Sequence, residues 1–317
     1  MKKINTAIVM LLVNLMFFLP AYAQNDESPK NRRYLNPVFE QTVRTANIVY
    51  GEAINKDGKK EQLKLRLFEP KGDTAIKRVL FILTPGGGFV QHGDNWMDAF
   101  GEQMARAGYV VAINRYRLAS AINSPESYGD ALFKAVADQK TVIKFFVKDA
   151  QGENQYRIDT DNIFIGGHSA GAITSMHTAY IDENDELAKF MADALKNNGG
   201  LEKAKAKGKP AYVIRGVINL SGLLTNINIL DADEPALLNI HGDLDKVVPI
   251  GTSAMGGYGS IPIHEQAKKV GLVSELHVIH GAAHNDTAEP ELCEECIPLT
   301  KRFMFEIIKS SANKTSD

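Results

Sequence analysis

The stretch Gly167-His168-Ser169-Ala170-Gly171 decides the fold of this chain. It follows the short apolar run 162–166 and opens a segment with helical character. Gly-x-Ser-x-Gly between a strand and a helix is typical of a nucleophile elbow, a turn so tight that the serine is strained and its hydroxyl is exposed. The flanking glycines let neighbouring backbone come close, and the helix N-terminus favours developing negative charge. The motif therefore predicts Ser169 as a nucleophile.

Strands and helices alternate on both sides of this turn. Before it, the apolar patterns predict strands at 45–55, 62–70, 79–83 and 109–113, and helices over 97–107 and 128–148. After it, they predict a helix to about Ile181, strands at 213–220, 236–240 and 275–279, and helices over 260–270 and 298–309. Such alternation predicts an α/β fold with a mostly parallel central sheet and helices on both faces.

A serine nucleophile needs a base to take its proton, and the base needs an orienting acid. On this class of fold the chain order is serine, acid, histidine, so the histidine comes late. His284 lies in the small-residue loop 281–285, just after a predicted strand. Loops after strand C-termini are where α/β sheets place their chemistry. We therefore favour His284, with His280 as the next candidate.

Two carboxylates qualify as the acid. Asp243 and Asp245 both follow the predicted strand 236–240, within the segment His241–Pro249. Both stand at the sheet edge where His284 is expected. Their positions alone do not separate them.

The attacked carbonyl develops an oxyanion, which needs backbone N–H donors. Ala170 follows the nucleophile and can supply one. The run Gly86-Gly87-Gly88 follows the predicted buried strand 79–83. Consecutive glycines contribute no packing, but their backbone can come close to a ligand. We expect the remaining donors in this run; the alternative is a plain flexible turn.

Four segments match the motifs of a known family. Pro85–Phe89 is similar to the family's His-Gly-Gly-Gly-Phe, and Asn114–Ala119 is similar to its Tyr-Arg-Leu-Ala segment. Asp161-Asn162-Ile163 leads into the elbow as it does in family members, and His241–Pro249 is similar to His-Gly-x-x-Asp-x-x-Val-Pro. Residues of about 60–290 thus resemble an α/β-hydrolase of the carboxylesterase type, close to the bacterial hormone-sensitive-lipase-like and small acyl-esterase groups.

The resemblance implies a triad of Ser169, Asp245 and His284, because Asp245 matches the family's acid. It implies the N–H groups of Gly87, Gly88 and Ala170 as the oxyanion hole. It also implies hydrolysis of carboxylic esters, small or polymer-derived, with no metal and no organic cofactor. The chain departs from the family at Pro85, where the family has a histidine whose imidazole steadies the loop.

The same triad and the same fold also occur in proteins with other functions. A peptidase, or an acetyl or feruloyl esterase acting on polysaccharide, would use the same triad. Peptidases of the prolyl-oligopeptidase group carry a large additional domain, for which this chain has no room. A non-catalytic binding protein on a hydrolase fold is the alternative from another class. Such proteins usually lose a triad member, and all three positions are filled here.

The N-terminal residues indicate export. A positive start at Lys2 and Lys3, the apolar run Ile8–Leu19 and the ending Ala21-Tyr22-Ala23 describe a signal peptide over 1–23; an uncleaved anchor is the alternative. We expect a periplasmic or secreted protein with no stable membrane anchor after processing. Residues 24–36 are expected to be disordered and 37–312 to form the hydrolase domain. The formal net charge of −2 and the lack of a basic patch argue against nucleic acid as a partner.

Two further features of the sequence, a cysteine pair and a Lys-rich stretch, belong to none of the motifs above. Cys293 and Cys296 are the only cysteines, and in an exported chain we favour a local disulfide over a redox pair. The Lys-rich stretch 182–211 separates the nucleophile helix from the next strand. A solvated surface excursion is favoured there over a small helical flap near the site.

Overall fold

The computed structural model describes residues 32–93, 97–201, 210–253 and 256–314. The predicted signal peptide 1–23 and the following residues 24–31 lie outside the described residues, as does 202–209 of the Lys-rich stretch. Within the described ranges, no helix is both long and apolar enough to cross a membrane.

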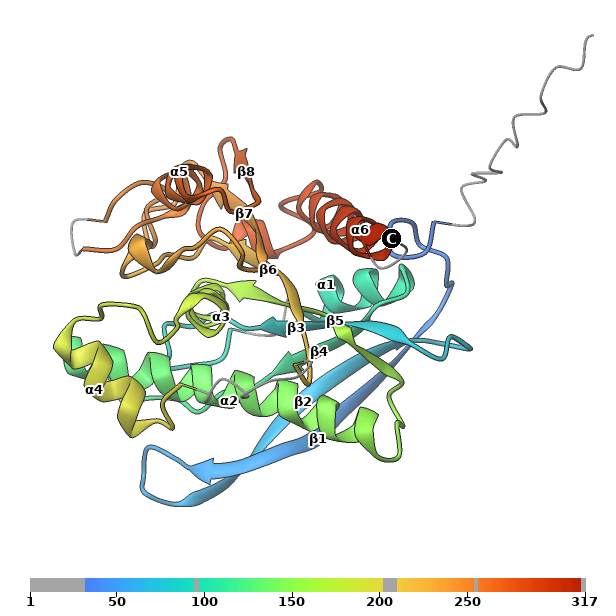
Figure 1. Cartoon of the computed structure of the whole chain (residues 1–317), viewed down its shortest axis with the longest axis horizontal. Coiled ribbons are helices and arrows are strands. Elements are labelled where there is room, and N and C mark those ends of the chain that lie inside the picture. The colour runs from blue at the N-terminus through green and yellow to red at the C-terminus, as the bar shows by residue number, and fades with distance from the viewer. Residues whose placement is uncertain (1–31, 94–96, 202–209, 254–255, 315–317) are drawn as a thin grey trace, which may run out of the picture.

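One eight-stranded sheet runs through the molecule in the order β1-β2-β4-β3-β5-β6-β7-β8 (Figure 1). The strands are β1 Thr42–Ile54, β2 Lys60–Pro70, β3 Arg78–Thr84, β4 Val110–Asn114, β5 Ile158–His168, β6 Ile214–Leu220, β7 Ala236–Gly242 and β8 Ser274–Ile279. β1 pairs antiparallel with β2, and β2 pairs antiparallel with β4. The pairings among β3 to β8 are parallel. The predicted α/β fold with a mostly parallel sheet is confirmed.

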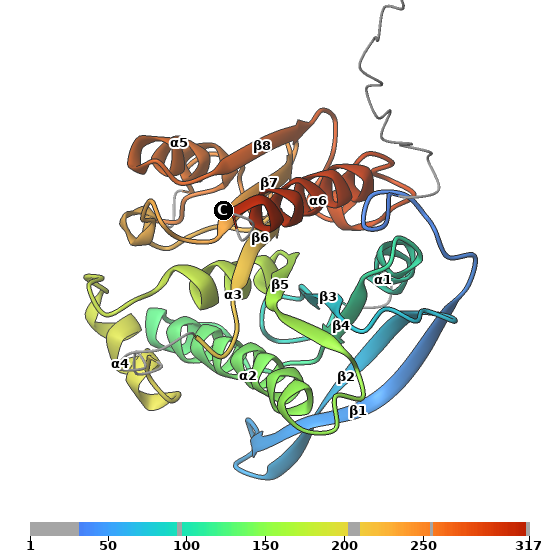
Figure 2. The same ribbon diagram turned by 45° about the vertical axis from the view of Figure 1, so that its right-hand side comes forward.

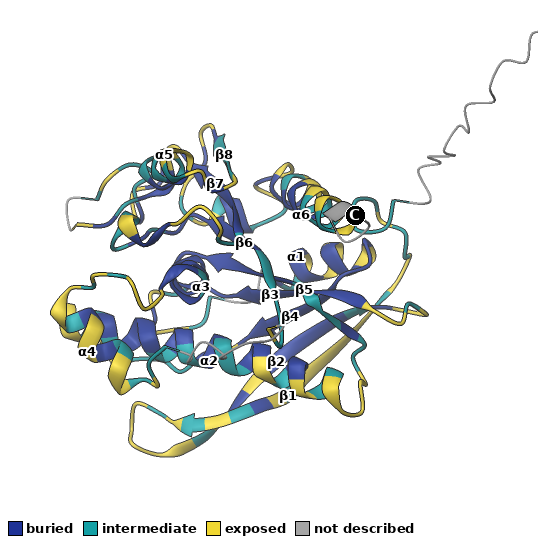
Figure 3. Ribbon diagram, viewed as in Figure 1, coloured by how far each residue is buried: buried dark blue, intermediate teal, exposed yellow. Residues whose placement is uncertain are grey.

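Helices cover both faces of the sheet (Figure 2). One apolar layer takes in residues of α2 Pro125–Gln151, α3 Ala170–Tyr180, α4 Lys189–Asn197 and α5 Ser260–Val270. The other layer takes in residues of α1 Met97–Arg106 and α6 Cys296–Lys314. Successive side chains of β3 alternate between these layers: Leu80 and Ile82 join the first, Phe81 and Leu83 the second. This is why the central strands are apolar without interruption and buried along their length (Figure 3).

Three helices differ from the sequence prediction, and one of them, α6, spans Cys296–Lys314 where 298–309 was expected. α2 begins at Pro125 rather than at 128, because Ser124 caps it in a capping box with Ser127 and proline suits the first turn. The prediction relied on the spacing of apolar residues, and the first turn of α2 has none. The stretch expected as a solvated excursion contains α4, whose Met191 and Ala194 are buried. α4 packs on α2 where the lack of a side chain at Gly129 leaves room for Phe190 and Ala194.

Residues 32–36, at the end of the segment expected to be disordered, form a turn held against the domain. The Arg33 guanidinium donates to both carboxylate oxygens of Asp73, at 2.8 and 2.7 Å, and to the Gly108 carbonyl at 2.8 Å. The Tyr109 hydroxyl donates to the Tyr34 carbonyl at 2.7 Å. Composition alone does not reveal these partners, which lie about 40 and 75 residues away along the chain.

A buried ion pair ties the chain after β4 to α2. The Asp138 carboxylate accepts from the backbone N–H of Arg117 at 2.7 Å and from its guanidinium Nε at 2.9 Å. Burial raises the pKa of Asp138, although the charge and hydrogen bonds of Arg117 oppose that rise. Without Arg117 the carboxyl would be left buried with no cation beside it.

We therefore expect Arg117→Met to lower the free energy of unfolding by about 3 kcal/mol, since removing one partner strands a buried charge. The matched control is Lys134→Met, which breaks the more exposed pair of Lys134 with Asp130 on the same helix and should cost less than about 1 kcal/mol. Urea denaturation of both variants measures the difference. Equal losses would contradict this account of the buried pair.

Candidate active site

Ser169 stands at the turn between β5 and α3, in a backbone conformation with φ 52° and ψ −122°. This region is strained for a residue with a side chain. Gly167 and Gly171 make the turn feasible, because a Cβ at either position would overlap the Thr84 carbonyl oxygen of β3. The Ser169 N–H donates to the Leu220 carbonyl of β6 at 2.9 Å, which holds the turn from the other side. The predicted elbow geometry is present.

The three residues of the predicted triad lie in one hydrogen-bonded chain. His284 Nε2 is 2.9 Å from Ser169 Oγ, and His284 Nδ1 is 2.6 Å from Asp245 Oδ2. The carboxylate can only accept, so Nδ1 carries the proton and Nε2 is free to accept from the serine hydroxyl. The side chains follow the ends of β5, β7 and β8, with β6 lying between β5 and β7 in the sheet. This is the arrangement a base needs in order to activate a hydroxyl.

Asp245 is ionised and held in place. Its Oδ1 accepts from the N–H groups of Val247 and Val248, at 2.9 and 2.8 Å. Its Oδ2 also lies 3.2 Å from His241 Nε2, although that nitrogen is closer to the Val248 carbonyl, at 2.8 Å. Burial opposes the charge, but hydrogen bonds from His241, His284 and Val248 outweigh burial and hold the pKa of Asp245 far below its usual range. The carboxylate is therefore negative at any pH near neutrality.

The two alternative candidates meet each other rather than the serine. His280 Nδ1 is 2.9 Å from Asp243 Oδ2, and Oδ1 of the same carboxylate accepts from the Gly281 N–H at 2.7 Å. The His280 hydrogen bond lowers the pKa of Asp243. The His280 side chain is 86% exposed. This pair braces the loops after β7 and β8 at the surface.

The glycine run lies directly against the nucleophile. A Cβ at Gly86 would come within 3.2 Å of the Ser169 Cβ. Gly87 and Gly88 have φ of 114° and 60°, in the left-handed region that glycine adopts without strain. Among the described residues, the N–H groups of Gly87, Gly88 and Ala170 have no hydrogen-bond partner. These three donors are thus available to a ligand oxygen beside Ser169.

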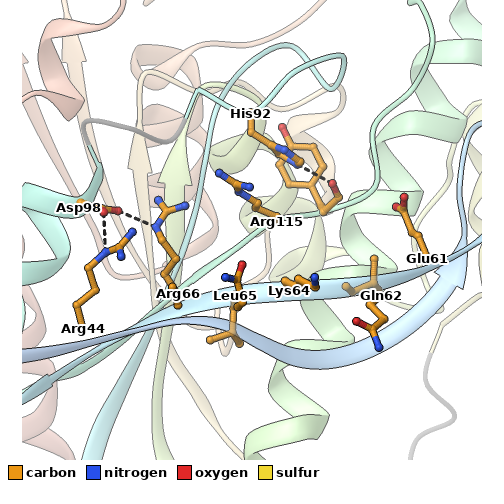
Figure 4. Close-up of a pocket in the computed structure, with 13 residues that line it drawn as sticks. Arg44, Glu61, Gln62, Lys64, Leu65, Arg66, His92, Asp98 and Arg115 are labelled. Atoms are coloured by element: carbon orange, nitrogen blue, oxygen red, sulfur yellow. Dashed lines mark hydrogen bonds and ion pairs between the residues drawn. The ribbon is translucent and has the colours of Figure 1, made fainter.

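Support for this loop comes from a residue after the glycines. His92 Nε2 donates to the Tyr116 carbonyl at 2.8 Å, and the Gly93 N–H donates to the Gly86 carbonyl at 3.1 Å. His92 also lines a hollow of about 480 Å³, in which Asp98 pairs with Arg44 and Arg66 (Figure 4). With Pro85 in place of the family's histidine, His92 anchors the loop from its far end. The sequence offered no signal for this role.

His168, the residue before the nucleophile, also contacts the site. Its Nε2 lies 2.8 Å from the His284 carbonyl, and the two rings are 4.7 Å apart. A carbonyl only accepts, so Nε2 carries a proton. Burial, together with the nearby His284, lowers the pKa of His168 to about 3. His168 is therefore neutral and places no positive charge beside His284. Sequence reasoning treated it only as a variable position of the motif.

Other contacts join the same loops. Ser221, just after β6, has φ 51°, and its hydroxyl lies 2.8 Å from that of Thr287, in the loop after His284. Cys293 and Cys296 form the local disulfide that we favoured for an exported chain. Within the described ranges, no group of three or more His, Cys, Asp or Glu side chains is placed to hold a metal ion.

Solved structures with the same fold include several of one enzyme. Thermogutta terrifontis esterase 2 phosphorylated by paraoxon has a TM-score of 0.63 at 20% identity, covering 83% of this chain and 94% of that one. The propionate-bound form has a TM-score of 0.62 at 20% identity, covering 82% and 93%. The butyrate-bound form has a TM-score of 0.60 at 18% identity, covering 81% and 94%. No curated protein matches the chain.

The fold and the elbow place the chain in the α/β-hydrolase class. The family model described as BD-FAE matches residues 65–225, about half of the chain. The chain belongs to this family, an esterase family of the α/β-hydrolase type. Its class of reaction is accordingly the hydrolysis of esters by a serine enzyme.

The contact of His168 with the His284 loop leads to a prediction. We expect His168→Phe to lower kcat about tenfold with KM unchanged, since the loss of the donor frees the His284 backbone. His168→Gln, which keeps an N–H donor, should recover most of that loss. Ester hydrolysis and thermal unfolding are measured side by side. Equal kcat for the two variants, or a loss that follows unfolding, would contradict a positioning role.

Proposed function

We propose that the chain is an exported serine hydrolase that cleaves carboxylic esters through an acyl-enzyme, with Ser169, His284 and Asp245 as its triad. The observation that carries this proposal is the hydrogen-bonded chain from Asp245 Oδ2 through His284 to Ser169 Oγ. Family membership supplies the class of reaction, and the geometry supports the roles of the individual residues.

In the first half of the reaction, His284 Nε2 takes the proton of Ser169 as Oγ attacks the ester carbonyl carbon. The carbonyl oxygen becomes an oxyanion, and the N–H groups of Gly87, Gly88 and Ala170 are its proposed donors. The negative Asp245 stabilises the imidazolium that forms on His284. His284 then gives its proton to the leaving alkoxide, and the C–O bond breaks to leave an acyl group on Ser169.

In the second half, water takes the place of the alcohol. His284 Nε2 accepts a proton from water as its oxygen attacks the acyl carbon, and the same N–H donors hold the second oxyanion. Collapse returns the proton to Ser169 Oγ and releases the carboxylic acid. Each proton passes through His284, so a neutral His168 beside it matters: a second cation there would oppose imidazolium formation.

Two further observations bear on the substrate and the location. Thermogutta terrifontis esterase 2 is recorded with propionate, with butyrate and phosphorylated by paraoxon. We propose that this chain likewise acts on uncharged carboxylic esters and reacts with organophosphates at Ser169. Residues 1–23 support export, and with it an ester substrate derived from material outside the cytoplasm.

Ser169→Ala tests the proposal directly. We expect ester turnover to fall by about a millionfold, because loss of the nucleophile in a triad enzyme has an effect of that order. A fluorescent phosphonate should label the parent protein and leave the variant unlabelled. Ser310→Ala, in a serine of α6 whose hydroxyl donates to the Ile307 carbonyl, is the control and should keep full activity. More than trace turnover by Ser169→Ala would overturn the mechanism.

The choice of acid is tested by a matched pair of substitutions. Asp245→Asn should lower kcat by about ten-thousandfold, as the equivalent change does in serine proteases, because an amide no longer fixes the His284 tautomer. Asp243→Asn, two residues away, should change kcat by less than about threefold, since that carboxylate braces a surface loop and this exposed pair is weak. A larger loss from Asp243→Asn would show that the acid is wrongly assigned.

A further inference from the structure

An apolar cavity of about 720 Å³ lies between α4, the first turns of α2 and the chain after β6. Its apolar wall comes from three separate parts of the chain: Ile122 and Tyr128; Leu187, Phe190 and Met191; and Leu223. No charged side chain lines it among the described residues. A volume of this size falls within the range of small-molecule sites.

Three polar side chains in the wall, those of Ser124, Thr225 and Asn226, are engaged in hydrogen bonds elsewhere. The Ser124 side chain caps α2, and the Thr225 hydroxyl lies 3.0 Å from His177 Nε2. The Asn226 side chain accepts from the Asn228 N–H and donates to the Glu186 carbonyl. Burial raises the pKa of Tyr128, so its phenol stays neutral. The cavity thus suits an uncharged, apolar occupant.

Two wall residues connect the cavity to the proposed catalytic loops, although no triad or oxyanion residue is among the described residues that line it. The Tyr128 ring packs edge-on against Phe89 at 5.9 Å, and Phe89 directly follows the oxyanion glycine Gly88. Leu223 directly follows Gly222, where a Cβ would lie 2.6 Å from the Ala172 Cβ and 3.3 Å from the Ile173 nitrogen. Ala172 belongs to the first turn of α3, which Ser169 opens. The wall residues Tyr128 and Leu223 are thus linked, through Phe89 and Gly222, to the oxyanion loop and to the helix that follows Ser169.

We infer that this cavity binds an apolar arm of the ester substrate, an alkyl chain or aryl group larger than acetyl, and that α4 and its preceding turn set this specificity. The inference rests on the proposed ester hydrolysis at Ser169. An acetyl group would leave most of the space empty. Each methylene that enters an apolar site gains about fourfold in binding, so longer esters should be favoured as long as the cavity holds them.

Two exposed alanines of the same segment allow a matched test. Ala188 lines the cavity, whereas Ala192, one turn further along α4, lines a separate hollow beside Asp182 and Leu195. Tryptophan at 188 fills the cavity from an exposed position, so the fold should tolerate it. Tryptophan at 192 adds the same side chain to the same surface helix without entering the cavity.

The experiment compares kcat/KM of the parent, Ala188→Trp and Ala192→Trp. Acetate, butanoate and octanoate esters of p-nitrophenol vary the acyl arm, and ethyl, octyl and naphthyl acetates vary the alcohol arm. We expect the parent to favour the larger esters of one series by at least about tenfold. Ala188→Trp should lose that preference and keep its activity on the smallest ester, and Ala192→Trp should match the parent. The series that responds identifies which arm enters the cavity.

Two results would overturn the inference. One is a parent that hydrolyses acetate esters as well as all larger ones in both series. The other is an Ala188→Trp variant that loses activity equally on every ester, or that behaves like Ala192→Trp. Failure of the proposed function itself would be distinct: the parent would hydrolyse no ester, or Ser169→Ala would hydrolyse them as well as the parent.

Discussion

The close approach of β3 to the nucleophile turn is the constraint on which the rest of the site depends. The Thr84 carbonyl occupies the space that side chains at Gly167 and Gly171 would fill. This contact permits Ser169 to hold φ 52°, a conformation that an isolated turn would leave. It also brings the chain after β3, with its glycine run, against the serine. The same close contact therefore positions both the proposed nucleophile and the proposed oxyanion donors.

The electrostatic design of the site follows from burial. Asp245 and His168 are both buried beside His284, but Asp245 stays charged whereas His168 becomes neutral. Asp245 keeps its charge because four hydrogen-bonding contacts hold it, whereas His168 becomes neutral because its pKa falls to about 3. One neighbour of His284 is thus negative and the other uncharged. That combination favours a transient positive charge on His284, which a triad base requires.

Much of the fold and site could be predicted from local sequence. The apolar runs located the central strands because a buried parallel strand is apolar on both faces. The elbow motif located Ser169 because only glycine fits beside it. Position alone left Asp243 and Asp245 equal, and resemblance to a family selected Asp245. The turn at Arg33 and the burial of α4 were not foreseen, because the residues they pack against lie far along the chain. The first turn of α2 was missed for a local reason, since its capping residues are polar and carry no apolar periodicity.

The sequence by itself therefore determined the class of fold, the proposed nucleophile Ser169 and the loops from which its partners come. Only the tertiary structure decided which partners meet. It pairs His284 with Asp245 and Ser169, and His280 with Asp243 at the surface. It also gives His168 and His92 contacts with backbone carbonyls 116 and 24 residues away. The physical reason is that local patterns report burial and turns, whereas a hydrogen bond between loops depends on how strand ends stand side by side in the sheet.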